Sequence, residues 1–281
     1  MKKAMYYTSE KKNVICLLCP HKCEIADNHT GRCKVRKNIG GELFAENYSK
    51  VSSIGVDPIE KKPLFHWREN SKILSFGSYG CNFSCAFCQN YAISMEKPKT
   101  HIIKPEEIIE LALQYNTPSI AYTYNEPTVF YEMMFETAVV AKEKNIDNVI
   151  VTNGFINKEP LLNILPYIDA MNIDLKTYSD ENYKKLGGIS VQHILDTIAI
   201  ANEHCHLEVT MLMVPKIMDD CEEFENLLIR LKQAAPKIVI HLSRYFPRYN
   251  YNEPATDILL MQKFKETANR YFEKVYLGNV R

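Results

Sequence analysis

Short apolar runs alternate with stretches of helical periodicity along this chain after residue 71. The runs have the length of buried strands, and the stretches between them place apolar residues three or four positions apart. The expected strands span residues 72–76, 119–124, 148–152, 170–174, 207–214 and 238–242, and the expected helices span 106–115, 128–144, 159–165, 191–203 and 221–234. A last helix at 256–271 precedes a short strand at 274–277. Repeated strand–helix units predict a parallel sheet, and six units are fewer than the eight of a closed TIM barrel. The pattern therefore predicts an α/β fold with a partial (β/α)6 TIM-type barrel.

Polar or turn-forming residues follow each of the six expected strands. In chain order they are a cysteine-rich loop, Tyr124-Asn125-Glu126-Pro127, Thr152-Asn153-Gly154, Asp174-Leu175-Lys176, Val214-Pro215 and the stretch from His241 to Tyr245. Barrel enzymes build their active sites at the C-terminal ends of the strands. We therefore expect these residues to meet at one rim and to form an active site.

The first 70 residues lack this periodicity and contain four cysteines, Cys16, Cys19, Cys23 and Cys33. We expect residues 1–70 to form a small Cys-rich N-terminal module and residues 71–281 to form the barrel. A short, loop-rich segment gains folding free energy from a bound metal. Four thiolates suit a zinc ion or a second iron–sulfur cluster, with His21 or His29 as replacement ligands. Thiols without metal in a packed loop are the alternative.

Composition bears on partners and location. The chain has 34 Lys and Arg against 34 Asp and Glu, so no net charge attracts nucleic acid or an anionic membrane. No apolar run approaches the roughly 20 residues that span a bilayer, and the first ten residues do not read as a secretory signal. Nine cysteines are present, seven of them in two tight groups. This pattern favours metal ligation in a reducing cytoplasm over a disulfide framework.

The second group, Cys81, Cys85 and Cys88, places three thiols within eight residues. Three thiolates are one short of a closed zinc site or a protein-saturated cluster. They suit a [4Fe–4S] cluster whose fourth iron stays open to a substrate or cofactor.

The spacing cysteine-x3-cysteine-x-aromatic-cysteine in this loop resembles the signature of the radical S-adenosylmethionine (SAM) enzymes. Similarity to one branch, the AmmeMemoRadiSam-system enzymes, extends over essentially the whole chain. These enzymes are related to the pyruvate formate-lyase activating enzymes. The matching segments include Cys16 to Cys23, Asp57 to Leu64, Cys88-Gln89-Asn90, Thr152-Asn153-Gly154, Asp174-Leu175-Lys176 and His241 to Tyr249.

The resemblance implies roles for single residues. Cys81, Cys85 and Cys88 would bind the cluster and Phe87 would flank the adenine of SAM. Glu126 would contact the SAM ammonium, or serve only as a residue at a helix N-terminus. Asn153, Asp174 and Lys176 would surround SAM and its carboxylate, although an ordinary Asp174–Lys176 ion pair is an alternative for the last two.

Two departures from the activating enzymes concern the rim. Val151 stands where they carry an aspartate that ligates a cation, and Lys216 stands where Val-Pro is normally followed by glycine. The candidates for a catalytic or substrate-clamping role are His241 and Arg244, whose spacing suggests that both reach the rim.

The expected function is that of a radical SAM oxidoreductase. An electron from a flavodoxin or ferredoxin would reduce the cluster, and reductive cleavage of SAM would give a 5′-deoxyadenosyl radical. That radical would abstract hydrogen from a small-molecule or peptide substrate. Activation of a glycyl-radical enzyme is an alternative. A non-catalytic metal-binding or interaction protein is the alternative of another class.

Overall fold

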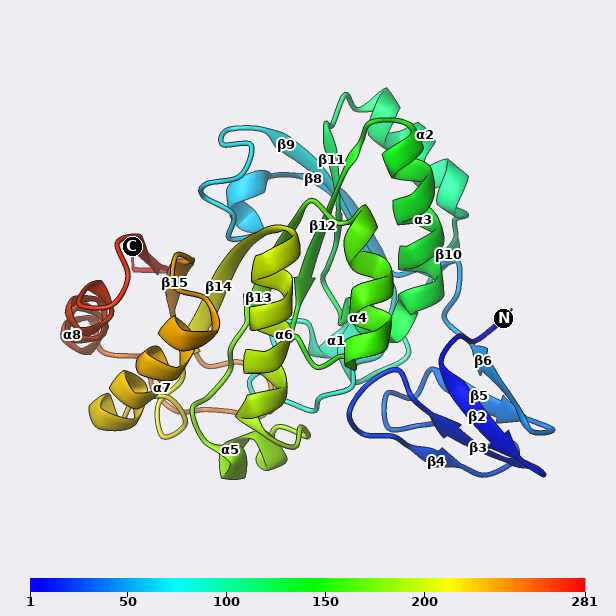
Figure 1. Cartoon of the computed structure of the whole chain (residues 1–281), viewed down its shortest axis with the longest axis horizontal. Coiled ribbons are helices and arrows are strands. Elements are labelled where there is room, and N and C mark those ends of the chain that lie inside the picture. Colours follow the sequence, from blue (N-terminus) through cyan, green and yellow to red (C-terminus); the bar gives the residue numbers. More distant parts are fainter. Residues whose placement is uncertain (281) are drawn as a thin grey trace.

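An eight-stranded sheet, curved into a partial barrel, dominates the computed structural model, which describes residues 1–280 (Figure 1). Its strand order is β16-β15-β14-β13-β12-β11-β9-β8. The strands span Ser53–Pro58 (β8), Lys72–Gly77 (β9), Ser119–Tyr122 (β11), Asp147–Thr152 (β12), Ala170–Asp174 (β13), His206–Met213 (β14), Val239–Arg244 (β15) and Val275–Gly278 (β16). Strand β8 is antiparallel to β9, and all other neighbours are parallel. The sheet confirms the predicted α/β partial barrel.

Helices connect the parallel strands. They span Tyr91–Ser94 (α1), Pro105–Gln114 (α2), Tyr131–Glu143 (α3), Lys158–Ile164 (α4), Asp180–Lys185 (α5), Val191–His204 (α6), Cys221–Ala234 (α7) and Ile258–Asn269 (α8). Short polar side chains begin several of them, as physical chemistry expects of N-caps. The carboxylates of Asp220 and Asp257 accept two backbone hydrogen bonds each at α7 and α8, and the Ser190 hydroxyl accepts one at α6.

Two expected elements change their bounds beside Glu126, where the backbone turns early. The strand expected at 119–124 ends at Tyr122, since Tyr124 adopts a left-handed φ of 68°. The helix expected at 128–144 starts as a 3-10 turn, Pro127–Phe130 (η2), and continues as α3. Both changes fall at the strand end that carries Glu126.

The N-terminal segment has more regular structure than its sequence pattern indicated. Strands Lys2–Lys3 (β1), Arg36–Ile39 (β5) and Glu42–Ala45 (β6) form one small sheet, and Tyr7–Glu10 (β2), Asn13–Cys16 (β3) and Glu24–Ile25 (β4) form another. They lie together at one end of the molecule, in blue (Figure 1). Lys50–Val51 (β7) pairs with His101–Ile102 (β10). Strand β8 also lies before residue 70 but belongs to the barrel sheet, so the two parts share that element.

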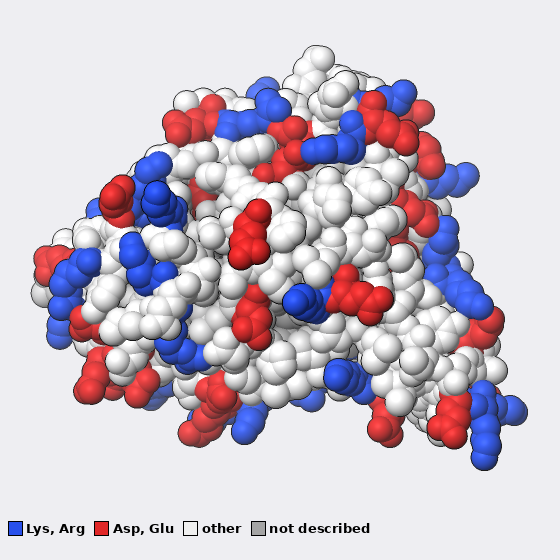
Figure 2. Space-filling view, viewed as in Figure 1, with Lys and Arg blue, Asp and Glu red and all other residues white. Residues whose placement is uncertain are grey.

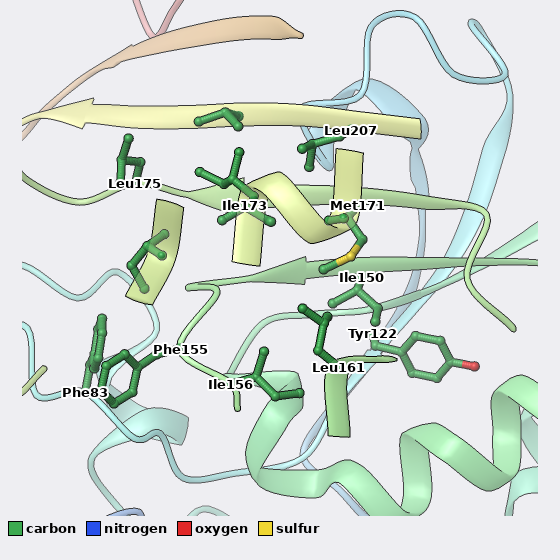
Figure 3. Close-up of a cluster of buried hydrophobic side chains, with 14 of the residues drawn as sticks. Phe83, Tyr122, Ile150, Phe155, Ile156, Leu161, Met171, Ile173, Leu175 and Leu207 are labelled. Carbon is green, nitrogen blue, oxygen red and sulfur yellow. The ribbon is translucent and has the colours of Figure 1, made fainter. Parts of the chain in front are cut away.

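Apolar side chains fill the space between the sheet and its helices. Figure 3 shows part of this core, with Ile150 and Met171 on the sheet and Leu161 on α4. At its edge Phe83 packs on Phe155, with ring centroids 5.1 Å apart. The core therefore reaches the loop that carries the three clustered cysteines.

The segment after β8 runs through the inside of the barrel. Ile59 and Leu64 are fully buried, and the Pro63 carbonyl accepts a hydrogen bond from Asn172 of β13. Glu208 of β14 accepts hydrogen bonds from the backbone N–H groups of the next residues of the segment. Interior polar residues of the sheet thus hold residues 59–66 in place.

Acidic and basic side chains are interspersed over the face in Figure 2, without one patch of a single sign. No helix within residues 1–280 is long and apolar enough to cross a membrane.

Candidate active site

A cavity of about 730 Å³ lies at the C-terminal ends of the parallel strands. Its lining includes most of the site residues expected from the sequence: Cys81, Cys85, Phe87, Cys88, Glu126, Asn153, Asp174, Lys176 and His241. The volume lies within the range of about 300–1,000 Å³ that is usual for ligand sites. Strand ends far apart in the sequence therefore supply one common site.

The cysteine loop is fixed to the barrel by the residues between its thiols. Asn82 is buried, donates to the Phe155 carbonyl oxygen at 2.9 Å, and accepts from Asn153 at 2.8 Å. The Phe83 ring anchors the loop in the core against Phe155 and Tyr183. These contacts leave the thiols on the cavity side of the loop.

The three thiols are buried or half-buried at the cavity. Burial raises the pKa of the Cys81 thiol, and raises that of Cys85 to about 11. The Phe83 N–H donates to the Cys81 sulfur at 3.3 Å, and Asn153 Nδ2 lies 3.9 Å from it. Donors aimed at a sulfur stabilise its thiolate form, which is the form that binds iron.

Asn125 and Glu126 link the ends of three neighbouring strands. Asn125 accepts from the Ser78 N–H and donates to the Gly80 carbonyl oxygen, both at 2.9 Å, so it holds the cysteine loop. The Glu126 carboxylate is buried and accepts from Thr128 N, Thr152 Oγ1 and Asn153 N at 3.0, 2.6 and 2.8 Å. Burial raises the Glu126 pKa, and these hydrogen bonds oppose the rise.

Glu126 therefore has the position that each of the two roles considered from the sequence requires. It caps η2 through the Thr128 N–H, and it lines the cavity. A carboxylate has about four acceptor positions, and the protein uses three of them. One position is left for a ligand donor.

Asp174 and Lys176 form an ion pair at the end of β13, with Lys176 Nζ 3.0 Å from Asp174 Oδ2. Both line the cavity. Burial by itself lowers the Lys176 pKa, but the Asp174 charge and the nearby cysteines raise it overall. Val151 also lines the cavity, whereas Lys216 points to solvent and pairs with Glu253 at 2.7 Å.

His241 and Arg244 do not share a face of β15. His241 and Ser243 line the cavity, and Arg244 is not part of its lining. The Arg244 guanidinium donates to the Thr256 carbonyl oxygen at 2.7 Å and lies over the Phe246 ring. Side chains alternate along a strand, so residues three apart point to opposite faces. The expectation that Arg244 reaches the rim is therefore corrected.

The Tyr-rich stretch after β15 packs on the outer side of the cysteine loop. Tyr249 stacks on Tyr91 with ring centroids 4.5 Å apart, and Tyr251 meets the Phe87 ring edge-on at 6.1 Å. The Asn250 N–H donates to the Ala86 carbonyl oxygen. This stretch supports the loop and, through Tyr251, the phenylalanine expected beside adenine.

Sequence reasoning gave no role to a second polar group in the cavity, formed by Asp57, Lys62 and Tyr124. Lys62 is only 4% exposed, its Nζ lies 2.8 Å from Asp57 Oδ2, and the Tyr124 hydroxyl donates to the same oxygen at 3.0 Å. Burial lowers the Lys62 pKa in spite of Asp57. The sequence feature that could have identified this group is the similarity of residues 57–64 to the AmmeMemoRadiSam-system enzymes.

The four N-terminal cysteines surround a second, much smaller cavity of about 20 Å³. Cys16 and Cys33 are buried, and Cys19 and Cys23 are half-buried. His21 also lines this cavity, while its Nε2 bonds to the Asn82 carbonyl oxygen at 2.9 Å. His29 does not contribute to the lining.

A partial barrel with three clustered cysteines at the strand ends defines a class of cofactor-dependent redox enzymes. The family model "Radical SAM superfamily" matches residues 76–228, which is more than half of the chain. The chain belongs to the radical SAM superfamily, whose enzymes use a [4Fe–4S] cluster and SAM.

The chain is also similar to individual proteins. The protein "Uncharacterized protein MJ0808" of Methanocaldococcus jannaschii is 40% identical over all of this chain and 86% of its own length. A "Putative glycyl-radical enzyme activating enzyme" of the same organism is 26% identical over 70% of this chain and 77% of its own length. Streptococcus suis SuiB bound to S-adenosylmethionine shares the fold, with a TM-score of 0.57 and 16% identity over 72% of this chain and 48% of SuiB.

Proposed function

We propose that Cys81, Cys85 and Cys88 hold the [4Fe–4S] cluster and that SAM lies across the strand ends beside it. The supporting observation is the single cavity that joins these thiols to Glu126, Asn153, Asp174 and Lys176. The donor set fits a cluster with an open iron, because it offers three sulfur ligands. When bound, the cluster supplies the electron that cleaves SAM to methionine and a 5′-deoxyadenosyl radical.

The chain's own residues orient SAM in this arrangement. Glu126 offers its remaining acceptor position to the SAM ammonium, in a charge-assisted hydrogen bond worth about 1.5–3 kcal/mol. Lys176 offers the opposite charge to the carboxylate, and the Phe87 ring flanks the adenine. Asn153 takes part indirectly, since its backbone N–H and side-chain amide hold Glu126 and Asn82.

The substrate lies against the remaining polar groups of the cavity, His241 and the Lys62–Asp57–Tyr124 group. A largely buried ammonium at Lys62 suits a substrate that carries carbonyl or carboxylate oxygens, since burial strengthens each hydrogen bond it donates. Tyr124 holds this group in place at a cost, because a left-handed backbone is unfavourable for a residue with a Cβ. The proposed activity is hydrogen abstraction from a small molecule or a peptide side chain.

Activation of a glycyl-radical enzyme is the second candidate, and the names of two relatives from Methanocaldococcus jannaschii favour it. In favour of peptide chemistry, the same fold occurs in SuiB bound to its precursor peptide SuiA. In both cases a flavodoxin or ferredoxin of the cytoplasm would deliver the electron. A glycyl radical formed on a partner protein, seen by electron paramagnetic resonance, would separate the two candidates.

The test is anaerobic reconstitution with iron, sulfide, a reductant and SAM, followed by a search for 5′-deoxyadenosine. We expect SAM cleavage by the wild-type protein and none by the variant with Cys81, Cys85 and Cys88 changed to Ala. A variant with Cys205→Ala and Cys221→Ala, two cysteines outside both groups, serves as the matched control and retains activity. A SAM-responsive cluster in the triple variant would refute the ligand assignment.

A further inference from the structure

The small cavity in the N-terminal module combines four thiols with a buried guanidinium that has an unused donor. Arg36 is 2% exposed, and its Nη atoms bond to both Glu132 oxygens at 3.0 and 2.9 Å and to the Met5 carbonyl oxygen at 2.6 Å. Arg36 Nε is buried and has no hydrogen-bond partner within residues 1–280. Such an orphaned donor costs about 1–3 kcal/mol unless a ligand satisfies it.

The cavity that Arg36 lines is the one formed by Cys16, Cys19, Cys23 and Cys33. Arg36, Cys16 and Cys33 therefore face the same small space. A negatively charged centre at the four sulfurs would accept a hydrogen bond from Arg36 Nε–H. Its charge would also balance the positive charge of the guanidinium, which already pairs with Glu132.

The small size of the cavity favours a compact occupant. About 20 Å³ is slightly more than the roughly 10–15 Å³ that one water requires. This space suits a single ion, whereas a [4Fe–4S] cluster brings eight atoms. Within residues 1–280 no three Cys, His, Asp or Glu side chains yet converge as tightly as a bound ion requires. Binding therefore requires the thiols to rotate inward, to about 2.3 Å from zinc.

We propose that Cys16, Cys19, Cys23 and Cys33 bind one zinc ion as a tetrathiolate centre, with Arg36 as the positioning residue that donates its Nε–H to a ligand sulfur. The four thiols lose their protons to solvent on binding, and the ion undergoes no redox change. Among the thiolate-bound metals, zinc suits a closed tetrahedral site.

The zinc centre also supports the cluster loop. Asn82 lines its cavity and adjoins Cys81 in the chain, and His21, between two of the ligands, bonds to the Asn82 carbonyl oxygen. Gly80, next to Cys81, packs directly on Cys33: a Cβ at Gly80 would lie 2.7 Å from the Cys33 carbonyl oxygen. A bound ion would thus stabilise the residues on which the loop with Cys81, Cys85 and Cys88 packs.

Metal analysis of purified proteins tests the proposal separately from the cluster assignment. We expect about one zinc per chain in the wild type, in the variant lacking Cys81, Cys85 and Cys88, and in the Cys205→Ser/Cys221→Ser control. Cys19→Ser with Cys33→Ser should remove the zinc while leaving iron binding at the other site to be measured independently. Iron and sulfide at the N-terminal site, or a folded protein without metal there, would overturn the proposal.

A second measurement covers the case in which the double serine variant does not fold. Arg36→Lys keeps a positive charge but loses the Nε–H, so zinc should bind about 10- to 100-fold more weakly, as is usual when an outer-shell partner is lost. The readout is competition with a chromogenic chelator. An unchanged zinc affinity in a folded Arg36→Lys protein would refute the role of Arg36.

Discussion

Replacing Glu208 with glutamine tests how the barrel interior is held together. The Glu208 carboxylate is fully buried on β14 and accepts four hydrogen bonds. His206 Nε2 and His66 N bond to Oε1 at 2.9 and 2.8 Å, and His241 Nε2 and Phe65 N bond to Oε2 at 2.6 and 3.0 Å. Every acceptor position is therefore used.

Glu208→Gln cannot satisfy this set in either orientation of its amide. The new NH₂ group always faces one histidine and one backbone N–H. The histidine can change tautomer and accept, but the backbone N–H is left without an acceptor, at a cost of about 1–3 kcal/mol. Loss of the carboxylate charge also weakens the remaining bonds, by about 1 kcal/mol in total. The variant should lose about 3 kcal/mol of unfolding free energy.

The Glu208 pKa leads to the same magnitude. Burial alone would raise it, but hydrogen bonds from His206, from His241 and from two backbone N–H groups lower it from 4.5 to about 2. Since a tenfold change in acidity corresponds to about 1.4 kcal/mol, a pKa lowered this far contributes about 3–4 kcal/mol. Because the folded pKa is the lower one, this stabilisation is present above pH 4.5 and is lost as the pH falls from 4.5 towards 2.

Urea unfolding followed by circular dichroism measures the effect. At pH 7 we expect Glu208→Gln to lose about 3 kcal/mol, and Glu203→Gln, a change at an exposed position of α6, to stay within about 0.5 kcal/mol. The difference between wild type and Glu208→Gln should shrink below pH 4.5. A loss under 1 kcal/mol at pH 7, or a difference independent of pH, would refute the reasoning.

Three further predictions concern the site and its supports. Glu126→Gln should weaken SAM binding to the reconstituted protein about 10- to 100-fold, measured by equilibrium dialysis, because it removes one charge-assisted bond. Gly80→Ala should lower the unfolding free energy by more than Gly40→Ala: both have positive φ, but only at Gly80 would a Cβ lie within 3 Å of other atoms. Arg36→Met should cost about 3–5 kcal/mol in urea unfolding, since it leaves Glu132 buried without its partner, and the double change to Met should recover part of the loss.

The barrel could be predicted because its strands are buried on both faces. Such strands appear as continuous apolar runs, and the helices between them carry their own periodicity. The N-terminal strands could not be predicted from the same pattern, for a physical reason. Strand β8 alternates half-buried and exposed residues and includes Gly55 and Pro58, so neither pattern identifies it as part of the sheet. Its pairing with β9 depends on tertiary structure.

The residues of the candidate site could be predicted where they come directly after a strand. Parallel strands bring their C-termini to one rim, so Glu126 and Asp174 reach one cavity although 48 positions separate them. Arg244 shows the limit, because its face depends on the two-residue repeat of β15. Glu208 shows another limit of prediction from the sequence. A carboxylate within an apolar run has no visible partner in the sequence, and its donors lie up to 143 positions away.

The segment from Asp57 to His66 connects these findings. Its first part places Asp57 and Lys62 in the cavity, and its last part fills the barrel interior, where Asn172 and Glu208 hold it. A barrel filled from within by its own chain leaves the strand-end rim as the approach for a substrate. The same segment thus fills the interior and places the Lys62 ammonium in the cavity, where it meets the substrate in the proposed function. This arrangement gives a physical reason for the buried Lys62 and its partner Asp57 in this segment.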